Sequence, residues 1–258
     1  MKTNVYPPSQ QAFGAFDGGK ITEQKPIGFP GEGSAVQRVG PLFYWSWFHA
    51  PKEGFIPAHP HQGFEILTYV VHGKAEHSDS LGTKSVVGIG GVQVMQTGSG
   101  VYHEERMIGP DAEGFQIWFE PHLKEAFKQS PTYHQMEHED FPAHSEHGVH
   151  TKTVIGQGSP VSLTTDAKMW DVHISAGQVH RPPLSSGYTL AALTIKGSGI
   201  WYEEGQNAAP TAFTEKDFTV LQAESNTKVV VAADAMQDVR LILVEVPIDP
   251  GYPLYPAR

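Results

Sequence analysis

The sequence contains no cysteine, which excludes disulfide bonds and thiolate metal sites. Because a cytosolic protein needs neither, this absence leaves the redox compartment open. Long hydrophobic runs are also missing. No stretch approaches the ~18 consecutive apolar residues of a membrane span, and residues 1–8 lack the apolar core of a secretory leader. We therefore expect a soluble, cytoplasmic protein without membrane contact.

Positive charge is scarce in this chain. Lys and Arg number 18 against 28 Asp and Glu, which gives a formal net charge of −10, and no run of basic residues stands out. Binding to nucleic-acid phosphates depends on clustered Lys and Arg side chains. Direct nucleic-acid binding is therefore not expected.

Glycine and proline, in contrast, are abundant, with 27 and 20 residues respectively. This bias is typical of many short strands joined by turns and not of helical bundles. Residues 68–71, Thr-Tyr-Val-Val, have the β-branched and aromatic character of a half-buried strand. The composition therefore predicts an all-β fold, and the length allows one large β-domain or two smaller ones.

Four potential metal ligands stand in two pairs that are well separated in the sequence. Side chains on a strand alternate between its faces, so His59 and His61 point the same way, as do His103 and Glu105. The Gly-rich segment between the pairs supplies corners that can fold the two strands side by side. Three imidazoles and a carboxylate would then converge inside a barrel as a mononuclear metal site. Pro60 cannot donate to a ladder, which places the first pair near a sheet edge or a barrel mouth.

An aromatic run, Phe-Tyr-Trp-Ser-Trp-Phe at residues 43–48, precedes the first pair. Two interpretations stay open. These side chains could pack a barrel wall, which we favour, or one or two of them could line a pocket for a flat aromatic substrate.

The remaining segments suggest the domain organisation. Residues 1–35 are expected to be mostly loop, with a short strand near residues 12–16. The composition then shifts at residues 130–150, where five histidines stand at irregular spacings among polar neighbours, which favours a solvated connection over a metal cluster. These histidines are His134, His138, His144, His147 and His150.

A second strand-rich unit follows over residues 151–246, and its similar rhythm indicates an internal duplication. The ligand set is not repeated there, because His173 and His180 stand alone. We therefore expect two domains. Residues 1–125 would form the metal-binding domain, and residues 126–258 would contain the His-rich connection and a metal-free second domain.

The motifs of the first half together resemble the pirin family of the cupin superfamily, over most of residues 40–120. The resemblance implies a bicupin, two double-stranded β-helix barrels packed together, whose N-terminal barrel binds one metal ion, commonly iron. The motifs are His-Pro-His-Gln-Gly-Phe-Glu (59–65), Asp-Ser-Leu-Gly (79–82), Gly-Gly-Val-Gln-Val-Met (90–95), Gly-Ser-Gly-Val-Tyr-His-Glu-Glu (98–105) and Gln-Ile-Trp (116–118).

Carried onto this sequence, the resemblance implies a specific ligand set: His59, His61, His103 and Glu105. The expected cofactor is one divalent ion, Fe(II) first, although these donors also suit Mn, Ni, Co, Cu or Zn. The broader cupin pattern would instead make Glu65 the carboxylate ligand. We expect Glu105 to be both ligand and catalytic base, and Glu65 to orient an imidazole or to act as a second base.

The resemblance also implies a function, because several bacterial pirin-like proteins act as quercetin 2,3-dioxygenases and animal pirins are described as nuclear transcriptional co-regulators. The first hypothesis is a metal-dependent oxidoreductase that takes a flavonol such as quercetin and O₂. The second is a metal- or redox-responsive module that acts on a protein partner without catalysis. The third is a metal-dependent isomerase or hydrolase of some other small molecule. A deep cavity at the metal would favour an enzyme. Gln62 stands where pirins usually carry Arg, so the pocket rim is expected to differ.

Overall fold

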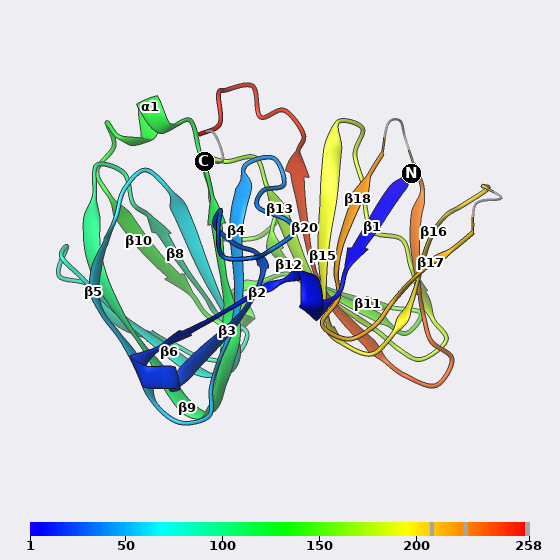
Figure 1. Ribbon diagram of the computed structural model, residues 1–258, viewed down its shortest axis with the longest axis horizontal. Coiled ribbons are helices and arrows are strands. Elements are labelled where there is room, and N and C mark those ends of the chain that lie inside the picture. Colours follow the sequence, from blue (N-terminus) through cyan, green and yellow to red (C-terminus); the bar gives the residue numbers. More distant parts are fainter. Residues whose placement is uncertain (207–208, 224–226, 256–258) are drawn as a thin grey trace. The chain divides into compact units, whose positions relative to one another are not determined.

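The computed structural model describes residues 1–206, 209–223 and 227–255, and most of the regular structure in these ranges is β-strand (Figure 1). The chain divides into two compact units. The N-terminal unit comprises residues 11–140, residues 163–165 and the segment from Tyr252. The C-terminal unit comprises residues 1–10, 141–162 and 166–251. The predicted all-β class is confirmed.

Within the described residues, a nine-stranded antiparallel sheet builds the N-terminal unit. The strand order is β10-β8-β6-β9-β4-β3-β2, and β5 pairs with β9 while β7 pairs with β6. A single turn of helix, α1 (Leu123–Ala126), follows β9. The strands are β2 (Ala12–Phe16), β3 (Ile21–Ile27), β4 (Leu42–Ala50), β5 (Gly54–His61), β6 (Glu65–Asp79), β7 (Lys84–Val87), β8 (Val92–Gln96), β9 (Val101–Phe119) and β10 (Thr132–Met136).

Strand β9 is the centre of this sheet and begins with the strict alternation of a strand that has one buried face. At its start Val101, His103, Glu105 and Met107 are buried, whereas Tyr102 between them is 59% exposed. Its first half pairs with β5, its second half pairs with β4, and β6 runs along its other side. The inward face of β9 therefore faces side chains from several strands at once.

Strand β3 corrects the expectation that residues 1–35 are mostly loop. Its inward positions alternate as Ile21, Glu23 and Lys25, all of which are buried. Charged residues rarely occupy buried positions, so the pattern was not recognised as a strand. The expected short strand near residues 12–16 is present as β2, which pairs with β3.

The C-terminal unit contains two sheets among the described residues. One has the order β1-β18-β15-β20-β13-β12-β11 and the other has the order β14-β19-β16-β17. Buried aliphatic side chains pack with Trp201 and Phe213 to form its core. The strands are β1 (Lys2–Tyr6), β11 (Ala143–Glu146), β12 (Val149–Ile155), β13 (Lys168–Ile174), β14 (Val179–His180), β15 (Tyr188–Lys196), β16 (Gly199–Glu203), β17 (Thr211–Phe213), β18 (Phe218–Gln222), β19 (Val229–Ala233) and β20 (Val239–Pro247).

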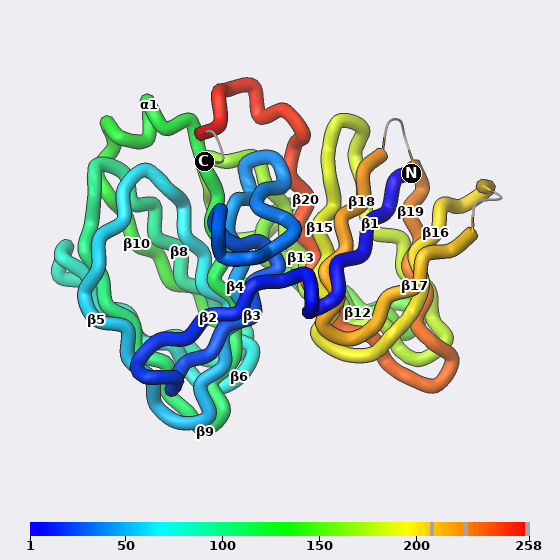
Figure 2. The backbone as a smooth tube through the Cα atoms, in the orientation of Figure 1, coloured from blue at the N-terminus to red at the C-terminus, as the bar shows by residue number. Residues whose placement is uncertain are grey.

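Two segments that were expected to be irregular contribute strands to the sheets of the two units. The start of the chain, blue in Figure 2, runs beside β18 as the antiparallel strand β1. The His-rich residues 130–150 include β10 and β11, which pair with β8 and β12. The five histidines of that segment are nonetheless exposed, as the solvated interpretation requires. None of the described helices is long and apolar enough to cross a membrane.

Candidate metal centre

The two His-containing segments predicted to meet are adjacent antiparallel strands. In the pairing of β5 with β9, His59 lies directly opposite His103, and His61 lies opposite Val101. Directly opposite side chains on one face are close enough to touch. The ladder between β5 and β9 is therefore what brings residues from distant parts of the sequence to one point.

The three imidazoles form a compact cluster. One nitrogen from each of His59, His61 and His103 can be chosen so that all three lie within 4.8 Å of one another. Within the described residues, this is the one group of three or more His, Cys, Asp or Glu side chains that could hold a metal ion. The Nε2 atoms of His59 and His103 are 2.9 Å apart. The Nδ1 atom of His59 lies 2.9 Å from the Pro57 carbonyl, which can only accept, so Nδ1 carries the proton and Nε2 keeps a free lone pair.

Burial keeps the His61 and His103 rings neutral. Desolvation, together with the nearby His103 and His59 rings, lowers the pKa of His61 to about 3, and Glu105 only partly opposes this. Desolvation also lowers the pKa of His103 to about 3, with added repulsion from His59 and His77. Neutral imidazole is the form that binds a metal ion. The cluster therefore fits a divalent metal by its nitrogen donors, their spacing and their protonation.

Glu105 lies in the same cavity as His59 and His61. Its carboxylate is almost completely buried, and both of its oxygens accept hydrogen bonds from Gln116 Nε2, at 2.8 and 3.0 Å. The Gln116 amide oxygen in turn accepts from Trp118 Nε1 at 3.1 Å. A chain of side chains thus holds Glu105 beside the imidazoles, although its oxygens are not part of the three-nitrogen cluster.

Glu65 lies elsewhere and is fully engaged by other groups. Its carboxylate accepts hydrogen bonds from Gln96 Nε2 at 2.7 Å and from the backbone N–H groups of Thr164 and Thr165 at 2.6 and 2.9 Å. It lines a separate cavity of about 330 Å³ that contains none of the three clustered histidines. The alternation counted from His61 to Glu65 is interrupted because the chain turns at Gly63, where φ is +85°.

The cavity at the cluster has a volume of about 430 Å³ and mostly aromatic and aliphatic walls. Tyr44 and Phe48 from the aromatic run line it, whereas Trp45, one position over, is fully buried against Phe115. Trp118 forms another wall and contacts the His61 ring edge to face at 4.8 Å. Both interpretations of the aromatic run therefore apply, to alternate residues.

Charged side chains of β3 form a polar part of the same cavity. Glu23 accepts hydrogen bonds from Tyr44 Oη at 3.1 Å and from Ser46 Oγ at 2.7 Å. Burial, together with the charge of Glu23, raises the pKa of Tyr44. Lys25 pairs with Glu23 at 3.6 Å and with Glu32 at 2.6 Å. Sequence reasoning did not identify this cluster because it did not recognise β3.

His77 and Asp79 were also not identified as site residues. His77 lies on β6 opposite Glu105, and its Nδ1 is 3.4 Å from Nδ1 of His103. Its Nε2 is 2.9 Å from the Asp79 carboxylate. Desolvation alone would raise the pKa of Asp79, but hydrogen bonds from His77, Thr83 and Leu81 lower it overall. The spacing His-x-Asp on a strand was the available signal, since it puts both groups on one face.

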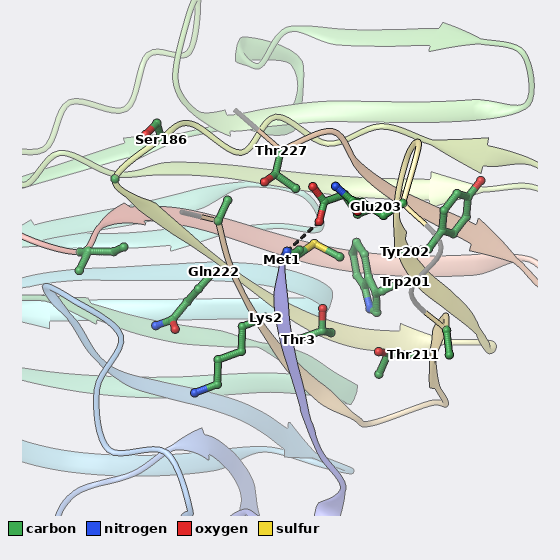
Figure 3. Close-up of a pocket in the computed structure, with 15 residues that line it drawn as sticks. Met1, Lys2, Thr3, Ser186, Trp201, Tyr202, Glu203, Thr211, Gln222 and Thr227 are labelled. Atoms are coloured by element: carbon green, nitrogen blue, oxygen red, sulfur yellow. Dashed lines mark hydrogen bonds and ion pairs between the residues drawn. The ribbon is translucent and has the colours of Figure 1, made fainter. Parts of the chain in front are cut away.

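The C-terminal unit has a larger cavity, of about 1060 Å³, with different chemistry (Figure 3). Its lining mixes hydroxyl, amide and apolar groups without histidine, and the Met1 amino group pairs with Glu203 there at 2.7 Å. His173 and His180 do not line it. His173 lies 3.5 Å from Asp171, and burial alone lowers the pKa of His180 to about 4.

Known proteins share both sequence and fold with this chain. The family model described as Pirin matches residues 44–119. A pirin-like protein of Caulobacter vibrioides is 30% identical over 204 residues, which cover 76% of this chain and 78% of that protein. The matched regions span 62% and 51% of the length of two plant pirin-like proteins, so the chain corresponds to only part of those relatives.

Solved structures support the predicted bicupin fold. A bacterial pirin from Escherichia coli in complex with nickel(II) superposes with a TM-score of 0.76 at 19% identity, covering 95% of this chain and 99% of that one. Quercetin 2,3-dioxygenase from Acinetobacter baumannii superposes with a TM-score of 0.77 at 19% identity, covering 98% and 81%. At this identity the likeness concerns the fold, and the predicted fold class is confirmed.

Proposed function

This chain belongs to the pirin family, and from that premise we propose that its N-terminal unit binds one divalent metal ion and acts as a dioxygenase on flavonol-type substrates. The observation that carries the proposal is the cluster of three imidazoles at the wall of an aromatic cavity. The proposed ligands are His59, His61, His103 and Glu105. Fe(II) is the proposed ion, and nickel(II) is the alternative that the Escherichia coli structure supports.

The cavity suits a flat, polyhydroxylated ring system. Its volume of about 430 Å³ lies within the ~300–1,000 Å³ typical of small-molecule sites. Tyr44, Phe48 and Trp118 offer aromatic surfaces against which such rings can stack. Rings packed there would exclude water from the part of the cavity next to the histidines. The carboxylate of Glu23 is an acceptor for a substrate hydroxyl, because its Oε2 makes no hydrogen bond within the described structure and has only the longer ion pair with Lys25 at 3.6 Å.

Proton transfer is assigned to Glu105. A divalent ion held by His59, His61, His103 and Glu105 would supply Lewis acidity that makes a substrate hydroxyl more acidic. The Glu105 carboxylate lines the same cavity and accepts that proton, while the two hydrogen bonds from Gln116 fix its orientation. Glu65 is not assigned a catalytic role, because its lone pairs are directed at Gln96 and at two backbone amides.

The regulatory alternative, a module that binds a protein partner without catalysis, predicts a filled barrel. The open cavity beside the imidazoles favours the enzyme instead. The name of the Acinetobacter baumannii neighbour, a quercetin 2,3-dioxygenase, gives the reaction to test first.

The test has two parts. Protein purified anaerobically and loaded with Fe(II) is analysed for metal content, and oxygen uptake is then followed with quercetin. We expect one ion per chain and quercetin-dependent uptake, and the double variant His59→Ala/His61→Ala should lose both. Metal retained by the double variant would contradict the ligand assignment. Metal binding without oxygen uptake for any flavonol would contradict the dioxygenase assignment alone. His72→Gln, an exposed histidine on β6, is the control.

A further inference from the structure

We propose that Asp79 and His77 form a hydrogen-bond relay that sets which nitrogen of His103 faces the metal site. The inference rests on the proposed metal centre. It concerns two residues outside the cluster, His77, which contacts His103, and Asp79, which contacts His77. It does not depend on the dioxygenase reaction.

The relay begins at a carboxylate with a fixed orientation. The Asp79 side chain is completely buried. Its Oδ1 accepts the backbone N–H groups of Leu81 and Thr83, at 2.9 and 3.1 Å. Only Oδ2 is left to face His77 Nε2, at 2.9 Å. Because a carboxylate can only accept, His77 must carry a proton on Nε2.

The second step passes this constraint to His103. With its proton on Nε2, a neutral His77 presents the bare Nδ1 to Nδ1 of His103, at 3.4 Å. His103 then donates from Nδ1, and its Nε2 is left without a proton. That Nε2 is the atom 2.9 Å from Nε2 of His59. Two bare nitrogens at this separation repel unless a cation lies near them, so the relay prepares the site for a metal ion.

The His77 ring is also held in position by packing. The Tyr133 ring stacks on it at 4.3 Å with an interplanar angle of 17°, and Tyr133 Oη lies 2.5 Å from Ser85 Oγ. His77 is 3% exposed. Carboxylate–imidazole–metal arrangements, in which a partner fixes the ligand's tautomer, are a known means of tuning metal sites. Here a second imidazole is inserted between the carboxylate and the ligand.

The isosteric variant Asp79→Asn gives the sharpest test. Its amide oxygen stays with the two backbone N–H groups, so its NH₂ group faces His77 Nε2 and forces the proton of His77 to Nδ1. The Nδ1 of His103 must then accept, which moves the proton of His103 to Nε2, the nitrogen that should bind metal. We expect zinc(II) and nickel(II) affinity, measured by titration calorimetry on the full chain, to fall ~10–100-fold.

A second pair of variants separates positioning from packing. His77→Gln can accept from His103 with its amide oxygen and donate to Asp79 with its NH₂ group, so it should retain most of the affinity. His77→Leu can do neither and should lose it. His72→Gln, on the same strand but exposed, should bind as the wild type does. Thermal melts of the metal-free variants verify that each has folded.

Nitrogen-15 NMR of histidine-labelled, zinc-loaded protein reports which ring nitrogens carry a proton. A role of Asp79 and His77 in packing alone would not change this protonation. We expect His103 to be metal-bound through Nε2 and protonated on Nδ1, and His77 to be protonated on Nε2. Wild-type affinity and the same ring protonation in folded Asp79→Asn would overturn the relay. If the wild-type chain bound neither ion, the metal centre itself would be wrong and the relay would fall with it.

Discussion

At the residue scale, Glu105 and Glu65 show how two buried carboxylates of the same sheet come to lie in different environments. The first lies in the cavity of the imidazoles and is hydrogen-bonded by one amide group. The second is bound by two backbone N–H groups and by Gln96. Sequence spacing allowed either to be the ligand, because a turn at Gly63 that changes the alternation is not visible in a count of residues.

These environments predict opposite effects of the same substitution. Glu105→Gln should leave the fold intact but reduce kcat by ~10²–10⁴-fold if it removes a general base. Glu65→Gln should leave kcat nearly unchanged and lower the free energy of unfolding by ~1–3 kcal/mol, because its new NH₂ group would face N–H donors. Oxygen-uptake kinetics and urea unfolding check both. Metal content must be measured in each variant, since loss of the ion would mimic loss of the base. The reverse pattern would exchange the two roles.

The depressed pKa values of His61 and His103 predict the pH dependence of stability of the metal-free chain. Both pKa values fall from 6.5 to about 3, so between these values the unfolded chain binds more protons than the folded one. Stability should therefore decrease as the pH is lowered from 7 to 4, by up to about 1.4 kcal/mol per pH unit for each group. Urea unfolding at several pH values measures this slope. His61→Asn/His103→Asn should have a shallower slope, and an unchanged slope would refute the assignment.

At the scale of elements, the strands that carry the proposed ligands were predictable, but the neighbouring strand β3 was not. His59 and His61 were predicted to share one face of a strand, and His103 and Glu105 one face of another. Strands β5 and β9 bring the three histidines into one cluster, and Glu105 lines the same cavity as His59 and His61. Strand β3 was missed because Glu23 and Lys25 occupy buried positions, where they stabilise each other by an ion pair. Alternating hydrophobicity in a sequence identifies strands whose inward face is apolar. It does not identify strands whose inward face is polar, and such strands form much of a binding site.

Gly114 tests how closely β9 packs against its neighbours. A Cβ at this position would lie 2.4 Å from the Tyr69 carbonyl oxygen and 2.6 Å from the Phe48 ring. Gly114→Ala should therefore destabilise the chain by ~1–3 kcal/mol, because the strand or the ring must move. Gly88→Ala, whose Cβ would meet nothing within 4 Å, is the matched control and should stay within ~0.5 kcal/mol of the wild type. Equal unfolding midpoints in urea for the two variants would contradict this packing.

At the scale of the whole molecule, the proposed metal site belongs to one of two units that have separate cores. The imidazole cluster lies on β5 and β9 of the N-terminal unit, whereas the core around Trp201 and Phe213 belongs to the C-terminal unit. A ligand that binds only the folded state stabilises it by RT ln(1 + [L]/Kd), about 2.7 kcal/mol at a hundredfold excess over Kd. When the units of a protein unfold separately, such a ligand raises the free energy of unfolding only of the unit that binds it.

We therefore expect nickel(II) to protect the N-terminal unit selectively against hydrogen exchange. Peptides from β5, β6 and β9 should exchange more slowly when the ion is present, by up to ~100-fold at a hundredfold excess over Kd, because their opening must release the ion. Peptides from β15, β18 and β20 should exchange at unchanged rates. Mass spectrometry of peptic fragments measures both sets in one experiment, and His59→Ala/His61→Ala provides the baseline without metal. Equal protection of the two sets would show that the units open together, and it would replace this two-unit description of stability with a single cooperative one.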